Sequence, residues 1–209
     1  MPAPVLVLAC GALDRTDDAA GLLAARALAD RLAARGVELE AVGDLSVDDL
    51  SERDPATRFV IVDAAYGPAP GEVVRLPFAA LPGSRAKPRS SHELPIPEML
   101  GLAELLAGRP LRGELVAIGI ASAGFGDVLT PAVSAGMPRF VDAVLAAVEE
   151  ALGHGGEPVP GDGSEAAPGV DAALPIVGRF GRGPSRRAAL PMSPRRRAAR
   201  WHGRSVARR

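Results

Sequence analysis

The stretch Val5–Gly21, VLVLACGALDRTDDAAG, decides the fold, because it joins an apolar strand to a helix through a short acidic turn. The aliphatic residues at its start end at a Cys-Gly pair, which is typical of a buried strand closed by a turn. Asp17 and Asp18 then precede a long run of good helix formers that stops at Gly36, a natural C-cap. The stretch therefore predicts a strand, a loop and a helix, with two carboxylates at the start of the helix.

Two interpretations of the pair Asp17 and Asp18 are open. A carboxylate at this place accepts backbone N–H groups of the first helical turn and meets the positive end of the helix dipole, which stabilises by about 1 kcal/mol. One aspartate suffices for capping, and the second would project over the strand end, where open α/β sheets bind ligands. Taken alone, the stretch favours capping over catalysis or metal binding.

The rest of the chain continues the alternation of strands and helices. The segment 72–76 follows the preceding strand too closely for a crossover helix, so we expect it to be antiparallel and at an edge of the sheet. The pattern predicts three layers, α/β/α, with helices on both faces of a mostly parallel, twisted sheet. The expected strands are 37–42, 59–62, 72–76 and 115–120, and the expected helices begin at Ser46, near Pro97 and at Pro131. The helix from Pro131 has an apolar stripe at helical spacing, within which Pro138 either kinks the helix or marks a later start.

Composition and charge divide the chain into two parts. Residues 179–209 hold 11 of the 24 basic residues and no acidic one, whereas residues 1–178 hold 13 basic and all 25 acidic residues. From residue 154 the chain is rich in Gly and Pro and then in Arg, a composition that buries too little apolar surface to offset its ordering entropy. We therefore expect an α/β domain over residues 1–153 and a disordered basic linker and tail over residues 154–209.

Several classes of protein are excluded by what the sequence contains. A single cysteine, Cys10, excludes an internal disulfide, and its place at the end of an apolar strand favours a buried structural thiol over a nucleophile. We find no signal peptide and no uninterrupted apolar run as long as a membrane span, so we expect a cytoplasmic protein. A small-molecule hydrolase is disfavoured by the lack of a Gly-x-Ser-x-Gly motif, and a nucleic-acid role would depend on the tail alone.

Three side chains fall where a doubly wound sheet would bring them together. Asp18 follows the first strand, Asp63 follows the strand 59–62, and His92 stands at the entrance to a helix. The carboxyl ends of parallel strands line one edge of a sheet, so the two aspartates should face a common crevice. Two carboxylates and an imidazole suit a divalent transition metal. Each residue alone has a simpler role in a cap or an exposed loop, and His154 and His202 look incidental.

Four segments in this order resemble the hydrogenase maturation proteases, which remove a C-terminal peptide from the large subunit of nickel–iron hydrogenases after nickel insertion. The resemblance covers about residues 4–152 and implies a sheet of the phosphorylase/hydrolase type. It rests on GALDRTDDAAG at 11–21, VIVDAAYGPAPGEVVRL at 60–76, SSHELPIPEMLGLAELL at 90–106 and IGIASAGFGDVLTPAVSAGMPRFVDAVL at 118–145.

The resemblance implies roles for particular residues. Asp18, Asp63 and His92 would bind the nickel of the precursor, with both aspartates catalytic in an aspartic-type peptidase. Gly43 and Asp44 occupy the place of a glycine-rich turn that binds substrate in the family. Nickel would arrive with the precursor, and no organic cofactor is implied. We expect a monomer whose partner is the hydrogenase large-subunit precursor.

The chain departs from the family pattern at two turns. Ala12 replaces an asparagine, Ala19 replaces a glycine, and the glycine-rich turn after the second strand is reduced to Val-Gly-Asp-Leu. Glycine permits backbone conformations that alanine resists, so the turns that hold the substrate look altered. The alternative to a protease is therefore a relative that binds the nickel site as a checkpoint and has lost proteolysis.

Overall fold

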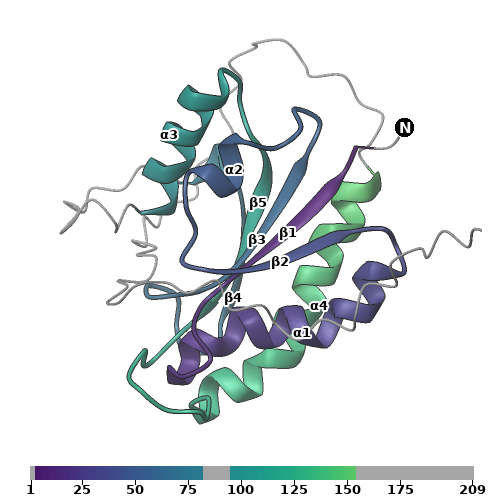
Figure 1. Ribbon diagram of the computed structural model, residues 1–209. Helices are drawn as coiled ribbons and strands as arrows, with labels where there is room; N and C mark the ends of the chain where they lie inside the picture. The colour runs from purple at the N-terminus through teal and green to yellow at the C-terminus, as the bar shows by residue number, and fades with distance from the viewer. Residues whose placement is uncertain (1–2, 82–94, 154–209) are drawn as a thin grey trace, which may run out of the picture.

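A computed structural model describes residues 3–81 and 95–153 (Figure 1). The predicted ligand His92 and the predicted disordered segment 154–209 therefore lie outside the described residues. The predicted domain boundary at 153 coincides with their limit. The elements in chain order are β1 (Val5–Cys10), the 3-10 turn η1 (Thr16–Ala19), α1 (Ala20–Ala33), β2 (Glu38–Gly43), α2 (Asp48–Ser51), β3 (Arg58–Ala65), β4 (Val73–Pro77), the 3-10 turn η2 (Phe78–Ala80), α3 (Ile96–Ala107), β5 (Arg112–Gly119) and α4 (Pro131–Gly153).

The five strands form one sheet in the order β2-β1-β3-β5-β4. β1 pairs in parallel with β2 and β3, and β3 pairs in parallel with β5. β4 runs antiparallel to β5 at the edge, because the turn between β3 and β4 is too short for a crossover helix. The predicted fold class and the predicted edge strand are both confirmed.

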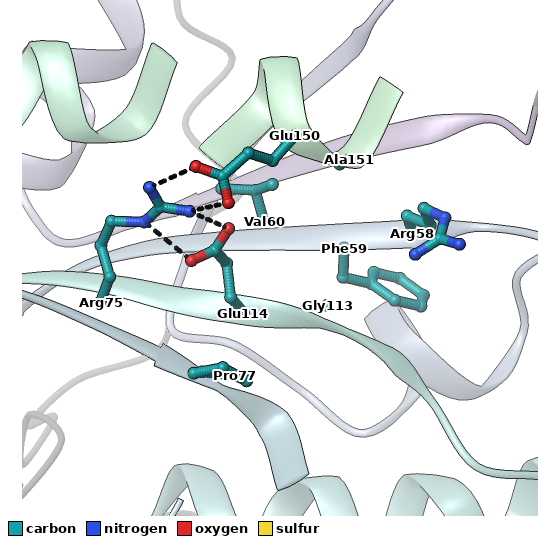
Figure 2. A pocket seen from close by; sticks show the side chains of 9 residues that line it. All are labelled: Arg58, Phe59, Val60, Arg75, Pro77, Gly113, Glu114, Glu150 and Ala151. Carbon is teal, nitrogen blue, oxygen red and sulfur yellow. Dashed lines mark hydrogen bonds and ion pairs between the residues drawn. The ribbon is translucent and has the colours of Figure 1, made fainter. Parts of the chain in front are cut away.

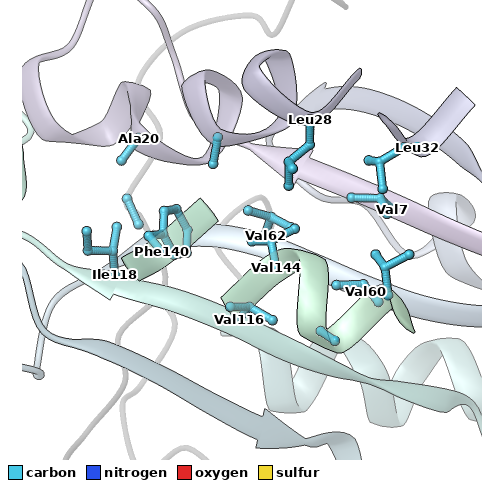
Figure 3. Packing of buried hydrophobic residues seen from close by; sticks show 14 of the residues in the cluster. Val7, Ala20, Leu28, Leu32, Val60, Val62, Val116, Ile118, Phe140 and Val144 are labelled. Atoms are coloured by element: carbon cyan, nitrogen blue, oxygen red, sulfur yellow. The ribbon is translucent and has the colours of Figure 1, made fainter. Parts of the chain in front are cut away.

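Helices cover both faces of the sheet, as Figure 1 shows. On one face α1 and α4 enclose a core of Val, Leu and Phe side chains that includes Leu28, Val62 and Phe140, all fully buried (Figure 3). On the other face α2 and α3 cover Leu8, Ile61 and other residues of opposite side-chain direction. β1 and the stretch Phe59–Val62 of β3 are buried on both faces, which is why both are uninterrupted runs of apolar residues.

The short helix α2 begins with reciprocal capping bonds. The Ser46 hydroxyl accepts the N–H of Asp49 at 3.4 Å, and the Asp49 carboxylate accepts the N–H of Ser46 at 2.9 Å. This arrangement satisfies donors that the first turn leaves without intrahelical partners. The helix predicted to begin at Ser46 is therefore present, although its helical residues are Asp48–Ser51.

The apolar residues of α3 are only partly buried. Met99, Leu100 and Ala103 face the sheet, whereas Leu105 is 75% exposed and Leu106 is 63% exposed. α3 thus covers the sheet with one narrow side, and apolar content alone does not say how wide the covered side is. In α4, by contrast, Pro138 lies within one continuous helix.

α4 is long and apolar enough to cross a membrane by length and composition alone. The sequence analysis did not single it out because its apolar residues are spaced rather than uninterrupted. One such helix is weak evidence, since core helices of soluble proteins meet the same criteria. Here Val133, Phe140 and Val144 are fully buried in the core between α4 and the sheet.

Candidate functional site

The switch point of the sheet lies between β1 and β3. From β1 the chain passes through α1 to β2 on one side, and from β2 it passes through α2 to β3 on the other side of β1. α1 and α2 lie on opposite faces, so the connections part at the carboxyl ends of β1 and β3. Open α/β sheets bind ligands in the crevice outside such a point. Asp18 and Asp63 belong to the segments that border it.

Asp63 lies within β3, because the strand continues to Ala65 rather than ending at residue 62. The pairing of β3 with β1 stops at Val62, so Asp63 is the first residue beyond that ladder, and it is 5% exposed. Its Oδ1 accepts the N–H of Ala64 at 2.8 Å. By strand alternation Asp63 shares the α2/α3 face with Ile61 and Ala65. The sequence predicted Asp63 directly after the strand, whereas the structure places it two residues before the strand ends.

Asp18 is fully buried in η1, directly above the end of β1. Its Oδ2 accepts the backbone N–H of Ala12 at 2.8 Å. Gly11 makes this approach possible: its φ is +124°, and a Cβ there would lie 2.0 Å from the Asp18 carbonyl oxygen. The turn after β1 is thus folded tightly around Asp18.

Asp17 has a different role, which the sequence analysis missed. Its Oδ2 accepts the N–H groups of Ala121 and Ser122 at 3.0 and 3.1 Å and the hydroxyl of Thr130 at 2.9 Å, and its Oδ1 accepts the N–H of Thr130 at 2.6 Å. The carboxylate therefore binds the loop between β5 and α4. No side-chain capping bond is present at the start of η1 or α1, so the hydrogen-bonding part of the capping interpretation is wrong, although both aspartates lie in the first turn of η1.

The thiol of Cys10, at the carboxyl end of β1, is affected by several nearby carboxylates. Burial raises the pKa of its thiol well above the usual range, and the carboxylates of Asp63, Asp44, Asp49 and Asp18, in that order, raise the pKa further. Negative charge near a thiol disfavours the thiolate. Asp18 and Asp63 thus both lie close to the end of β1, and Cys10 is the buried, inert thiol that its position in the sequence predicts.

Gly43 and Asp44 follow β2 beside the same turn. The carbonyl of Gly43 accepts the N–H of Gly11 at 2.9 Å, and Gly43 has a φ of +66° that favours glycine. The register between β1 and β2 shifts here, since Ala9 pairs with Ala41 but Cys10 with Gly43. Asp44 is exposed. A bulge at the rim of a sheet re-aims the chain that follows. The turn borders the crevice, and its binding of substrate stays a prediction.

The metal site predicted from the sequence is only partly described. His92 lies in the segment 82–94, outside the described residues. Within residues 3–81 and 95–153 no group of three His, Cys, Asp or Glu side chains is arranged to hold a metal ion. Of the three predicted ligands, the structure therefore brings two, Asp18 and Asp63, to the neighbourhood of Cys10.

A hollow of about 550 Å³ lies at the amino ends of β3 and β5, away from the candidate site (Figure 2). Within it, Arg75 donates to both carboxylate oxygens of Glu114 and to both of Glu150, at 2.8 to 2.9 Å. These bonds raise the pKa of the Arg75 guanidinium, Glu150 contributing most. Four of the five N–H donors of this guanidinium join α4 to β4 and β5, so we assign the hollow a structural role.

The fold and the carboxylates at its switch point define an open α/β protein with a candidate acid–base site outside the ends of β1 and β3. The family model of the HycI hydrogenase maturation proteases matches residues 24–147, which is more than half of the chain. The chain belongs to the hydrogenase maturation protease family. The match includes Asp63 and His92 but begins after Asp18.

Solved structures agree with this membership. The [NiFe] hydrogenase maturation protease HybD from Thermococcus kodakarensis is 30% identical, with a TM-score of 0.51 over 69% of this chain and 99% of that chain. The hydrogenase maturating endopeptidase HybD from E. coli is 26% identical, with a TM-score of 0.54 over 70% of this chain and 93% of that one. HycI from Thermococcus kodakarensis, 20% identical with a TM-score of 0.54, supports the fold alone. No curated protein matched the sequence.

Proposed function

We propose that the protein is an endopeptidase that removes the C-terminal peptide of a nickel–iron hydrogenase large-subunit precursor after nickel insertion. The observation that carries the proposal is the pair of buried carboxylates, Asp18 and Asp63, beside the switch point of a chain that belongs to this family. A carboxylate is costly to desolvate, so a buried one needs a polar or charged partner, and one that lies beside a ligand-binding crevice is a candidate for binding or reaction. Family membership supports the peptidase class, and the geometry supports these two residues.

Recognition of the precursor would involve its nickel ion. Oxygen and nitrogen ligands suit nickel, so the carboxylates of Asp18 and Asp63 and the imidazole of His92 would complete the coordination of an ion already held by the precursor. Nickel is then part of the substrate, and the protein needs no organic cofactor. An empty precursor would lack the ion that these side chains bind, which makes cleavage wait for nickel insertion.

The chemistry that follows is hydrolysis of one peptide bond. A water molecule loses a proton to the carboxylate of Asp18 or Asp63, and its oxygen attacks the scissile carbonyl carbon. The C–N bond breaks, and the proton passes to the leaving nitrogen, so one water is consumed and a carboxyl and an amino terminus are formed. Both aspartates are buried, and the low dielectric constant of buried surroundings strengthens their electrostatic interaction with the charge that develops in the transition state.

The second candidate function is a checkpoint protein that binds the nickel site without cutting the precursor. The altered turns, with Ala12, Ala19 and a shortened turn after β2, favour it. Against it, the N–H of Ala12 reaches the Asp18 carboxylate without needing a polar side chain at residue 12. Ala19 has a φ of −68°, which alanine adopts without strain.

The decisive experiment incubates a nickel-loaded large-subunit precursor with the purified full-length chain and follows its mass. We expect loss of one discrete C-terminal peptide with the unaltered protein and none with nickel-free precursor. His92→Ala and Asp63→Asn should lower the cleavage rate by about a hundredfold or more. Asp30→Asn, at an exposed position of α1, is the matched control and should leave the rate unchanged.

Each other outcome has a definite meaning. Cleavage that proceeds unchanged with Asp63→Asn refutes the assignment of the site. A precursor that co-purifies with the chain but keeps its full mass supports the checkpoint function. We further expect the protein to act as a cytoplasmic monomer, which sedimentation of the purified chain and fractionation of cells would test.

A further inference from the structure

Large apolar side chains are exposed at two places among the described residues. Three lie on the outer side of α3, at Leu102, Leu105 and Leu106. The other four lie on segments that follow the carboxyl ends of β1, β3 and β5, which is the edge that carries the candidate site: Leu13 (43% exposed), Tyr66 (37%), Phe125 (79%) and Val128 (72%).

Two of these segments are joined into one rigid unit, which we call the loop platform and define as residues 11–19 and 121–130. Asp17 joins them through its four accepted hydrogen bonds. The N–H of Gly126 donates to the carbonyl of Asp14 at 3.0 Å, and the hydroxyl of Thr16 donates to the carbonyl of Ser122 at 2.9 Å. The loops therefore hold each other in place, although about a hundred residues separate them.

Phe125 is fixed in position while most of its surface stays open. The guanidinium of Arg15 lies over its ring at 4.6 Å from the centroid, and Arg15 is itself held by a bond to the carbonyl of Ala123 at 3.2 Å. A cation over a ring restrains the ring without covering its other face. An apolar side chain that is both exposed and held still loses little entropy when a partner covers it.

We propose that Leu13, Phe125 and Val128 form the docking surface for an apolar stretch of the precursor polypeptide next to the bond that is cut. The proposal rests on the proposed function. Its main support is continuity with the site, because Leu13 is the neighbour of Ala12, whose N–H binds the Asp18 carboxylate. A polypeptide whose scissile bond lies at Asp18 is thereby brought next to Leu13 on the platform, and the apolar side chains there recognise apolar side chains.

The test compares two double variants with matched exposure. Phe125→Ser with Val128→Ser alters the platform. Leu105→Ser with Leu106→Ser alters equally open side chains on α3, near the end of that helix away from the candidate site. Both are assayed against a concentration series of nickel-loaded precursor. We expect the platform variant to raise KM, and the Kd of the precursor, about tenfold or more while kcat changes less than about twofold. The α3 variant should change neither.

The outcomes separate this proposal from the proposed function. Cleavage by the unaltered chain together with an unchanged KM in the platform variant overturns the docking surface alone. A dimer that sedimentation detects and the platform variant abolishes, with KM unchanged, assigns the surface to a second copy and also overturns it. An unaltered chain that neither binds nor cuts the precursor overturns both. Binding without cleavage leaves the Kd comparison as the deciding measurement.

Discussion

Removal of the Asp17 carboxylate should destabilise the protein more than removal of any exposed acidic group. In Asp17→Ala, three backbone N–H groups and one hydroxyl lose a charged acceptor. Hydrogen bonds to a charged group contribute about 1.5 to 3 kcal/mol each. Ala121 is exposed and Ser122 and Thr130 are half-buried, so water recovers part of this loss. We therefore expect the free energy of unfolding to fall by about 3 to 4 kcal/mol.

Urea unfolding of the full-length chain, followed by circular dichroism, measures this change. Asp14→Ala is the matched control, since Asp14 lies in the same loop with an exposed side chain, and it should stay within about 0.5 kcal/mol of the unaltered protein. Thr130→Val removes one of the four donors and should lose about 1 kcal/mol. Combined with Asp17→Ala it should cost little more, because the bond it removes is already absent.

Two results would contradict this account of Asp17. A loss below about 1 kcal/mol in Asp17→Ala would mean that the four bonds exchange with water at almost no cost. Additive losses in the double variant would mean that Thr130 acts on stability through other contacts. Either result would also count against a rigid loop platform.

Three further predictions concern single features. Cys10 should react with a thiol reagent far more slowly in the folded chain than in urea at pH 8, because burial and nearby carboxylates raise its pKa. Since the pKa of this thiol is higher in the folded chain than in the unfolded chain, its contribution to stability should be lost only as the pH rises above about 9. Gly21→Ala should cost about 2 kcal/mol or more in urea unfolding, because a Cβ there would lie 2.5 Å from the Cys10 carbonyl oxygen. Arg75→Met should cost about 1 kcal/mol at low salt and less in 1 M NaCl, whereas Arg35→Met, which breaks one exposed ion pair, should stay within about 0.5 kcal/mol.

The strands and their order along the chain could be predicted because each is signalled locally. An apolar run between turn residues, such as residues 59–62, marks a buried strand whatever lies elsewhere in the chain. The limits of the elements depend on pairing instead. β3 continues to Ala65 because β5 offers partners as far as Gly119, a fact that no local pattern carries. For the same reason the sequence placed Asp63 at a strand end rather than inside the strand.

The division of labour between Asp17 and Asp18 could not be predicted from the sequence. Among the described residues, Asp18 accepts a hydrogen bond from Ala12, which precedes it in the chain, whereas Asp17 accepts hydrogen bonds from residues 121–130, which follow it. Local rules assign adjacent aspartates before a helix to capping, and they fail here because a distant loop supplies better donors. The sequence signal that could have suggested the contact is the Gly-containing loop after the last strand, which ends in Leu-Thr-Pro.

The altered turns bear on function less than their sequences suggest. The first turn needs a glycine at Gly11, where a Cβ would lie 2.0 Å from the Asp18 carbonyl oxygen, and α1 needs one at Gly21, where it approaches Cys10 of β1 and Val62 of β3. Both glycines are present. At Ala12 the site uses only the backbone N–H, and at Ala19 the backbone is helical. Ala12 and Ala19 thus fall where side chains are not required to shape the turn around Asp18, which favours the proposed proteolysis over the checkpoint function. A change of substrate would then depend on the surfaces around Asp18, which are the loop platform and the turn at Gly43.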